Sequence, residues 1–160
     1  MLAEDIKPNR LERAKLAIFD LVDKLEGDRV GLIAFSGQAF LQCPLTLDYD
    51  AFNQTLEIID TSIIPVGGTN IASAINEASV SFVHDDNEKI LILITDGEDL
   101  HRNGISLARK VNESGVKIYT VGVGSVTGEL IPVRQKPGEI EYLRDLEGNV
   151  VKTRLDSVTP

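Results

Sequence analysis

Several residue types are scarce in this 160-residue chain, and each shortage excludes a class of protein. The single cysteine, Cys43, cannot form an internal disulfide, which excludes a scaffold held together by disulfides. Only two histidines are present, His84 and His101, so the Cys/His spacing of a zinc site is missing. No stretch approaches the roughly 20 consecutive apolar residues that a membrane-spanning helix needs. Sixteen Lys and Arg against 25 Asp and Glu give a net charge of −9, which argues against nucleic acid as a partner.

The remaining composition, with 42% hydrophobic and 26% charged residues, is that of an ordinary globular domain. A chain of this length buries roughly 70% of its unfolded surface, so it can form a hydrophobic core without covalent cross-links. No linker or repeat divides the sequence. We therefore expect one domain over residues 1–160, with an irregular β-hairpin extension at about residues 125–156, where short apolar runs alternate with Pro and Gly turns.

Helix and strand patterns alternate along the chain. Amphipathic helices are predicted from Asn9 onwards and over Asp48–Ile59, Ile71 to about Val83, and Asn103–Ser114. Buried strands are predicted over Arg29–Phe35, Lys89–Thr95 and Val116–Val123. Ala39–Cys43 is predicted to be the antiparallel partner of the first strand in an edge hairpin, which Pro44 closes. This order predicts an α/β fold: a doubly wound, Rossmann-like and mostly parallel sheet with helices on both faces.

Ligands of such sheets bind beyond the carboxyl ends of the strands, which draws attention to two loops, Pro65–Asn70 and Thr95–Asp99. Asp96 directly follows the most apolar strand, and Thr69 precedes a predicted helix. Carboxylate and hydroxyl oxygens suit a hard cation such as Mg²⁺. Thr69 and Asp96 are therefore candidate metal ligands, and the residues expected to shape their loops are Gly67, Gly68, Asn70 and Gly97.

Simpler interpretations of the same residues stay open. Thr69 or Asn70 can cap the following helix, and Asp96 with Gly97 can form a plain turn. The sequence contains no Gly-x-Ser-x-Gly elbow, no Walker loop and no correctly placed dinucleotide fingerprint. We therefore expect a protein that is not an enzyme. The alternative is a small α/β hydrolase or phosphotransfer enzyme that uses Asp96 with Mg²⁺.

Five segments occur in the order and spacing typical of von Willebrand factor A-type domains: Arg29–Gly37, Cys43–Thr46, Gly67–Asn70, Leu93–Asp99 and Ile118–Gly124. Val133–Asp156 resembles the bacterial subgroup named for Bacteroides aerotolerance (Bat), whose members are membrane-anchored. The resemblance implies a metal-ion-dependent adhesion site (MIDAS) that binds Mg²⁺, or Mn²⁺ or Ca²⁺. It makes Thr69 the threonine of the second loop and Asp96 the aspartate of the third. It also implies a protein partner whose acidic group completes the metal shell, rather than a small-molecule substrate.

The sequence departs from that family in one important respect, because the Asp-x-Ser-x-Ser motif of the first loop is absent. Only Met1–Pro8 precede the first helix, and residues like Leu2–Lys15 follow that motif in Bat-like sequences. We therefore expect a partial domain, truncated at both ends, that lacks its first central strand. Metal binding should then be weak or absent, with Glu4 and Asp5 as the nearest substitute carboxylates.

Three functions follow from these expectations: a metal-impaired interaction module, the enzyme named above, or a scaffold whose partners bind the hairpin extension without metal. The gap left by a missing strand would also favour pairing with a second copy, because unpaired strand edges attract other strands. The resemblance implies a bacterial parent protein that holds the domain outside the cytoplasm. The location of this chain itself is left open.

Overall fold

The computed structural model describes residues 1–63, 66–83, 85–96, 104–125, 129–130, 132–136, 139–142 and 152–153. The chain divides into two compact units whose segments alternate along the sequence. Unit 1 contains Met1–Ala17, Ile94–Glu98 and Gly122–Pro160, and unit 2 contains Ile18–Leu93 and Asp99–Val121. The expectation of a single domain over residues 1–160 stays a prediction.

In unit 2, strands β1 (Val30–Phe35) and β2 (Ala39–Thr46) form the predicted antiparallel hairpin. The prediction that Pro44 closes this hairpin is wrong, because β2 continues to Thr46. Proline lacks an N–H donor, but an edge strand tolerates it wherever that N–H would face away from its partner strand. The register also shifts between Val30 and Leu32, so the pairing is irregular near the proline.

Helices α1 (Arg10–Val22) and α2 (Tyr49–Ile58) contribute to the first hydrophobic cluster of unit 2. Asp48 caps α2 as predicted, since its side chain accepts a hydrogen bond from the backbone N–H of Ala51 at 2.9 Å. Apolar side chains at helical spacing turn inward and pack against the hairpin. The buried members of this cluster are Val22, Cys43, Phe52 and Leu56.

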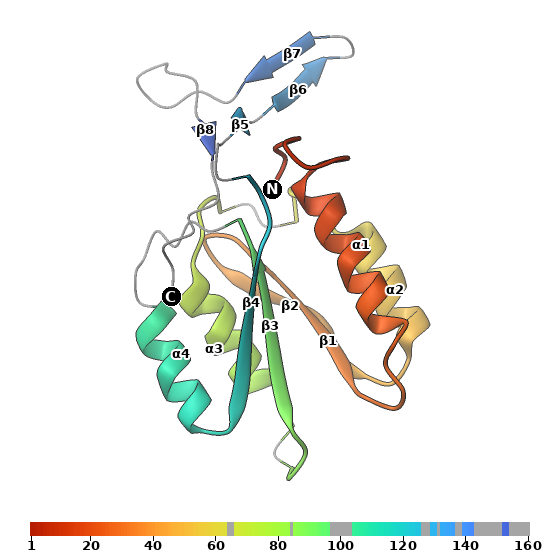
Figure 1. Cartoon of the computed structure of the whole chain (residues 1–160), viewed down its shortest axis with the longest axis vertical. Coiled ribbons are helices and arrows are strands. Elements are labelled where there is room, and N and C mark those ends of the chain that lie inside the picture. Colours follow the sequence, from red (N-terminus) through yellow and green to blue (C-terminus); the bar gives the residue numbers. More distant parts are fainter. Residues whose placement is uncertain are drawn as a thin grey trace. The chain divides into compact units, whose positions relative to one another are not determined.

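Strands β3 (Lys89–Thr95) and β4 (Val116–Gly122) are hydrogen-bonded neighbours that run in the same direction (Figure 1). Helices α3 (Ile71–Ser81) and α4 (Gly104–Glu113) lie beside them. A second cluster centres on Ile75, Val111 and Val116. The predicted α/β class, with helices and a parallel sheet, is therefore confirmed.

One detail of the strand prediction is wrong: β3 is not covered on both faces by the described part of the chain. Ile90 and Ile92 are 47% and 39% exposed, whereas Leu93 is 4% exposed. In addition, β1–β2 and β3–β4 are separate two-stranded sheets among the described residues. The proposal of a missing central strand remains a prediction.

Four short strands of unit 1, β5 to β8, lie within the segment predicted as a hairpin extension. β5 (Glu129–Leu130) pairs antiparallel with β8 (Lys152–Thr153), and β6 (Pro132–Lys136) pairs antiparallel with β7 (Glu139–Tyr142). Within the described residues, no helix has both the length and the apolar character that crossing a membrane requires.

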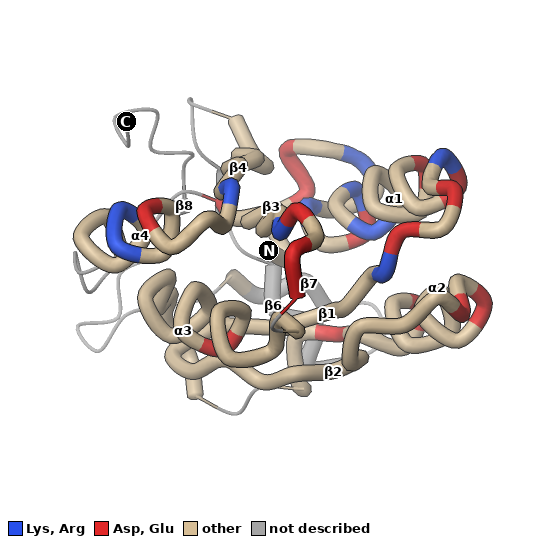
Figure 2. Tube along the Cα trace, turned by 90° about the horizontal axis from the view of Figure 1, so that it is seen from below, with Lys and Arg blue, Asp and Glu red and all other residues tan. Residues whose placement is uncertain are grey.

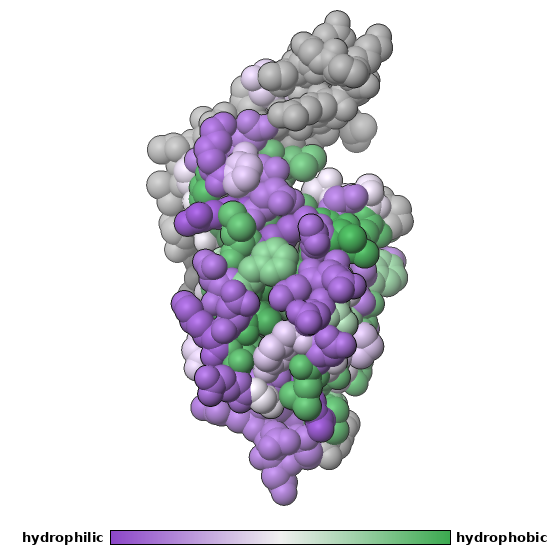
Figure 3. Space-filling model, turned by 90° about the vertical axis from the view of Figure 1, so that its right-hand side faces the viewer, coloured by the Kyte–Doolittle hydropathy of each residue, from purple (hydrophilic) through white to green (hydrophobic). Residues whose placement is uncertain are grey.

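Charge is distributed unevenly among the helices. α1 carries both acidic and basic residues along its length, whereas α3 carries Glu77 as its single charged residue (Figure 2). The face seen in Figure 3 is largely hydrophilic, and smaller groups of apolar side chains lie between the polar ones.

Candidate functional site

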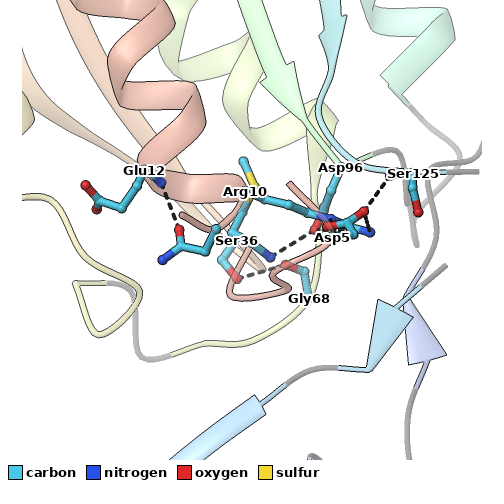
Figure 4. A network of polar contacts seen from close by, with 9 residues as sticks. Asp5, Arg10, Glu12, Ser36, Gly68, Asp96 and Ser125 are labelled. Carbon is cyan, nitrogen blue, oxygen red and sulfur yellow. Dashed lines mark hydrogen bonds and ion pairs between the residues drawn. The ribbon is translucent and has the colours of Figure 1, made fainter. Parts of the chain in front are cut away.

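The loop that carries Thr69 is held by hydrogen bonds to the turn after β1, within unit 2. The Ser36 hydroxyl donates to the carbonyl oxygen of Gly68 at 2.8 Å (Figure 4). The Gly37 N–H donates to the Val66 carbonyl at 3.0 Å, and the Asn70 N–H donates to the Ser36 carbonyl at 2.8 Å. Because these bonds flank Thr69 on both sides, they fix the path of the backbone through it.

Glycine is required where the two segments touch. A Cβ atom at Gly37 would lie 2.6 Å from the Gly67 carbonyl oxygen and 2.7 Å from Cγ1 of Val66, closer than real Cβ atoms approach. Gly68 has a φ of +113°, which L-residues with side chains rarely adopt. Gly37 therefore allows the two segments to approach each other, and Gly68 allows the backbone its positive φ.

Asn70 caps α3. Its side-chain oxygen accepts from the Ser73 N–H at 2.9 Å, and its Nδ2 donates to the Gly37 carbonyl at 3.4 Å. The simpler interpretation of Asn70 as a helix cap is thus confirmed. The hydroxyl of Thr69 makes no hydrogen bond to any described residue, so its oxygen is available to a ligand.

Asp96 follows β3 directly, within unit 1. The Val123 N–H donates to the Thr95 carbonyl at 2.8 Å, which fixes the backbone just before Asp96. One carboxylate oxygen, Oδ2, accepts from the amino group of Met1 at 2.9 Å and from Nη1 of Arg10 at 3.4 Å. The Asp96 side chain is 17% exposed. Gly97 and the acidic residues after it, Glu98 and Asp99, lie outside the described residues.

Arg10, the first residue of α1, is the centre of a buried charge network in the same unit (Figure 4). Its side chain is fully buried, and it binds Asp5 through two hydrogen bonds, Nε to Oδ1 at 2.9 Å and Nη2 to Oδ2 at 3.0 Å. The Ser125 N–H also donates to Oδ2 of Asp5, at 2.5 Å. Such a two-pronged pairing is the strong form of the Arg–carboxylate interaction.

These contacts shift the pKa values of both partners. The hydrogen bond from Arg10, aided by the one from Ser125, lowers the pKa of Asp5 from 3.8 to about 2, although burial works in the opposite direction. Burial lowers the pKa of the Arg10 guanidinium, but the hydrogen bond and charge of Asp5, with a further contribution from Asp96, outweigh that effect and raise it. Asp5 and Arg10 therefore form an ion pair across the whole physiological pH range.

The sequence patterns did not predict Arg10 as part of the site, and they indicated Asp5 only as a nearby carboxylate. The sequence does contain a signal for Arg10, because it predicts a cation in the first turn of a helix. The helix dipole disfavours a cation there, so an acidic partner is expected. Asp96, however, is 86 positions away from Arg10, and no spacing rule connects them.

The oxygen ligands that Thr69 and Asp96 offer suit Mg²⁺. The positively charged groups of Met1 and Arg10 that already contact Asp96 disfavour a further cation there. A carboxylate oxygen of Asp96 and the Thr69 hydroxyl are hard oxygen ligands. The described residues contain no group of three or more His, Cys, Asp or Glu side chains arranged to hold a metal. Thr69 and Asp96 belong to different units, so their joint action on one ion remains a prediction.

Comparisons with known proteins agree with the fold. A family model described as the von Willebrand factor type A domain matches residues 1–98. The crystal structure of BatB from Bacteroides thetaiotaomicron is 44% identical with a TM-score of 0.92, and the match covers 98% of this chain and 75% of that one. An aerotolerance-related membrane protein from Bacteroides fragilis is 41% identical with a TM-score of 0.91, covering 98% and 76%.

A curated relative is longer than this chain. An uncharacterised protein of Borreliella burgdorferi is 32% identical over 124 residues, which cover 73% of this chain but only 35% of that protein. The chain thus spans about a third of the length of this relative, whose remaining two thirds have no counterpart in the match.

Proposed function

Because the chain belongs to the von Willebrand factor type A domain family, we propose that it is a protein-interaction module that works through a divalent cation. In this proposal the ion binds Asp96 and Thr69, and an acidic side chain of a partner protein completes its shell. Domains of this family usually mediate protein interactions, which supports the module over an enzyme. The expected ion is Mg²⁺, with Mn²⁺ or Ca²⁺ as alternatives, because only hard oxygen ligands are offered.

The observation that carries the proposal is that Asp96 and Thr69 both lie at the ends of regular elements. Asp96 is the first residue after β3, and Thr69 precedes Asn70, the cap of α3. Backbone hydrogen bonds fix both positions, and the hydroxyl of Thr69 makes no hydrogen bond to a described residue. Gly67, Gly68 and Asn70 would hold the loop that carries Thr69, and Gly97 would shape the loop that begins at Asp96.

Calorimetric titration of Mn²⁺ and Mg²⁺ into the untagged, chelator-treated chain tests the metal site. The untagged form matters because the amino group of Met1 contacts Asp96. We expect weak binding that Asp96→Ala and Thr69→Ala both abolish, and that Asp85→Ala leaves unchanged. Asp85 is a suitable control because it is a described carboxylate in a separate contact with Asn87 and Lys89. Binding that survives Asp96→Ala would refute the site.

The interaction itself is tested with the immobilised chain. We expect a protein retained in Mg²⁺ to be released by EDTA and not to be retained by the Asp96→Ala variant. If the protein is retained in EDTA and also by the Asp96→Ala variant, the metal-independent scaffold is favoured. The Arg10–Asp96 ion pair gives that second candidate specific support, because it already neutralises the carboxylate.

The enzyme alternative is tested in the same preparations. Turnover of a generic phosphoester that Asp96→Ala abolishes would favour a Mg²⁺-dependent hydrolase over the interaction module.

We also propose that the parent protein is anchored in a bacterial membrane with this domain outside the cytoplasm. The relative from Bacteroides fragilis, described as a membrane protein, supports that assignment.

A further inference from the structure

We propose that Arg10 is a built-in cation for Asp96 and that it limits how tightly a divalent ion binds there. The inference deepens the proposed function, because it concerns the same carboxylate. Its consequence is that the metal affinity of this site is set by a residue that is not a metal ligand.

The guanidinium is fixed in place rather than resting on the surface. Asp5 binds it with two hydrogen bonds, at 2.9 and 3.0 Å, and its side chain is fully buried. The backbone at Gly124 lies directly against it: a Cβ atom there would come within 2.8 Å of Cζ of Arg10. Because Asp5 and Gly124 confine the guanidinium on two sides, it cannot swing away to make room for an ion.

Arg10 also acts on the carboxylate that a metal would use. Nη1 contacts Oδ2 of Asp96 at 3.4 Å, while Oδ1 of Asp96 accepts no hydrogen bond from any described residue. A divalent ion at Oδ1 would therefore share one carboxylate with a cation held on its other oxygen. Repulsion between such charges is large at short range and only partly screened at a side chain that is mostly buried.

Asp5 does not relieve this competition. Both of its oxygens are engaged, Oδ1 with Arg10 and Oδ2 with Arg10 and the Ser125 N–H. If the Arg10 charge is removed, Asp5 and Asp96 are left as two carboxylates around the volume that the guanidinium filled. The Met1 amino group stays on Oδ2 of Asp96, but a single positive charge then faces two carboxylates, and that arrangement attracts a divalent ion.

The test compares Mn²⁺ affinity by calorimetry in the untagged chain and in three variants, Arg10→Gln, Arg10→Lys and Lys15→Gln. Arg10→Gln should bind Mn²⁺ at least about tenfold more tightly than the unaltered chain, because one nearby positive charge is removed. Arg10→Lys keeps the charge and should not gain affinity. Lys15→Gln removes a buried cation from the same helix, where it pairs with Glu12 at 3.0 Å, and controls for net charge.

The outcomes separate this inference from the proposed function. A gain in Arg10→Gln that Asp96→Asn removes supports the inference even if the unaltered chain binds no Mn²⁺. No gain, or an equal gain in Lys15→Gln, overturns it and leaves Arg10 with a purely structural role. Survival of Mn²⁺ binding in the Asp96→Asn single variant refutes the proposed site instead.

If Arg10→Gln does not fold, the inference can still be tested by adding Mn²⁺. The inference then predicts that millimolar Mn²⁺ restores the circular dichroism spectrum and the cooperative melt of Arg10→Gln, because the ion replaces the missing charge. Arg10→Gln combined with Asp96→Asn should not be restored. Failure of Mn²⁺ to refold Arg10→Gln overturns the inference.

Discussion

At the scale of single residues, Asp5 links the stability of the chain to pH. Its pKa is lowered to about 2 in the folded state, chiefly by the hydrogen bond from Arg10, against 3.8 for an ordinary aspartate. A group whose pKa falls on folding stabilises the fold above its unfolded pKa, and that stability is lost as the pH drops through the folded pKa. Asp5 should contribute about 2 kcal/mol at neutral pH, and this contribution should be lost as the pH falls from about 4 through about 2.

Urea unfolding of the unaltered chain and of Asp5→Asn at several pH values checks this contribution. The two proteins should differ by about 2 kcal/mol at pH 7 and should converge below about pH 2, as Asp5 becomes protonated in both states. Other carboxylates titrate in both proteins and cancel in the difference. A difference that stays constant from pH 7 to pH 2 would show that Asp5 acts through shape rather than through its charge.

Gly124 supports the same network by its lack of a side chain. An alanine there would place its Cβ 2.8 Å from Cζ and 3.0 Å from Nε of Arg10, and its φ of +146° already favours glycine. Gly124→Ala should destabilise the fold by about 1–3 kcal/mol through overpacking and backbone strain. Gly115→Ala is the matched control, since φ is +96° but nothing lies within 4 Å of its Cβ; it should cost only about 1 kcal/mol. Equal costs in thermal or urea unfolding would contradict the contact with Arg10.

At the scale of elements, the turn after β1 and the loop before α3 act as one piece. Gly37 makes this possible, because any Cβ there would meet the Gly67 carbonyl at 2.6 Å. Gly37→Ala should therefore lower stability by about 1–3 kcal/mol and displace the loop that carries Thr69. Gly67→Ala meets nothing within 4 Å and should leave both properties almost unchanged. The free energy of urea unfolding and the amide chemical shifts around Thr69 are compared between the two variants. Equal changes in both would refute the close contact between Gly37 and the loop before α3.

The elements also show how far the sequence can be interpreted. Apolar runs and capping residues predicted β3 over Lys89–Thr95 and the cap of α2 at Asp48, because both signals are local. The extension of β2 beyond Pro44 was missed, since a proline within a strand is tolerated only through its edge position. Arg10 was missed for a different reason: a buried cation depends on partners, and Asp96 is far away in sequence. Local patterns predict elements, whereas charge networks depend on the tertiary fold.

At the scale of the whole molecule, the strand edges predict self-association. β1 pairs with β2 and β3 pairs with β4, and within the described part of the chain nothing pairs with their other edges. Apolar side chains flank the β3–β4 pair on its exposed face, namely Ile90, Ile92, Tyr119 and Val121, which are 39–55% exposed. Unpaired edges beside apolar surface are templates for a further strand. We therefore expect two copies of the chain to associate through these edges as the protein concentration rises.

Sedimentation velocity measures this association, and a lysine on the edge strand should oppose it. Ile92→Lys places a charge on β3, so two copies would bury that charge when they pair, and the dimer should weaken by about tenfold or more. Ile58→Lys is the matched control, because Ile58 lies on α2 and is already 74% exposed. The association should persist in high salt, since backbone hydrogen bonds and apolar contacts carry it rather than exposed ion pairs. A protein that stays monomeric at every concentration, or an equal effect of both variants, would mean that the open edges do not serve as an interface between copies.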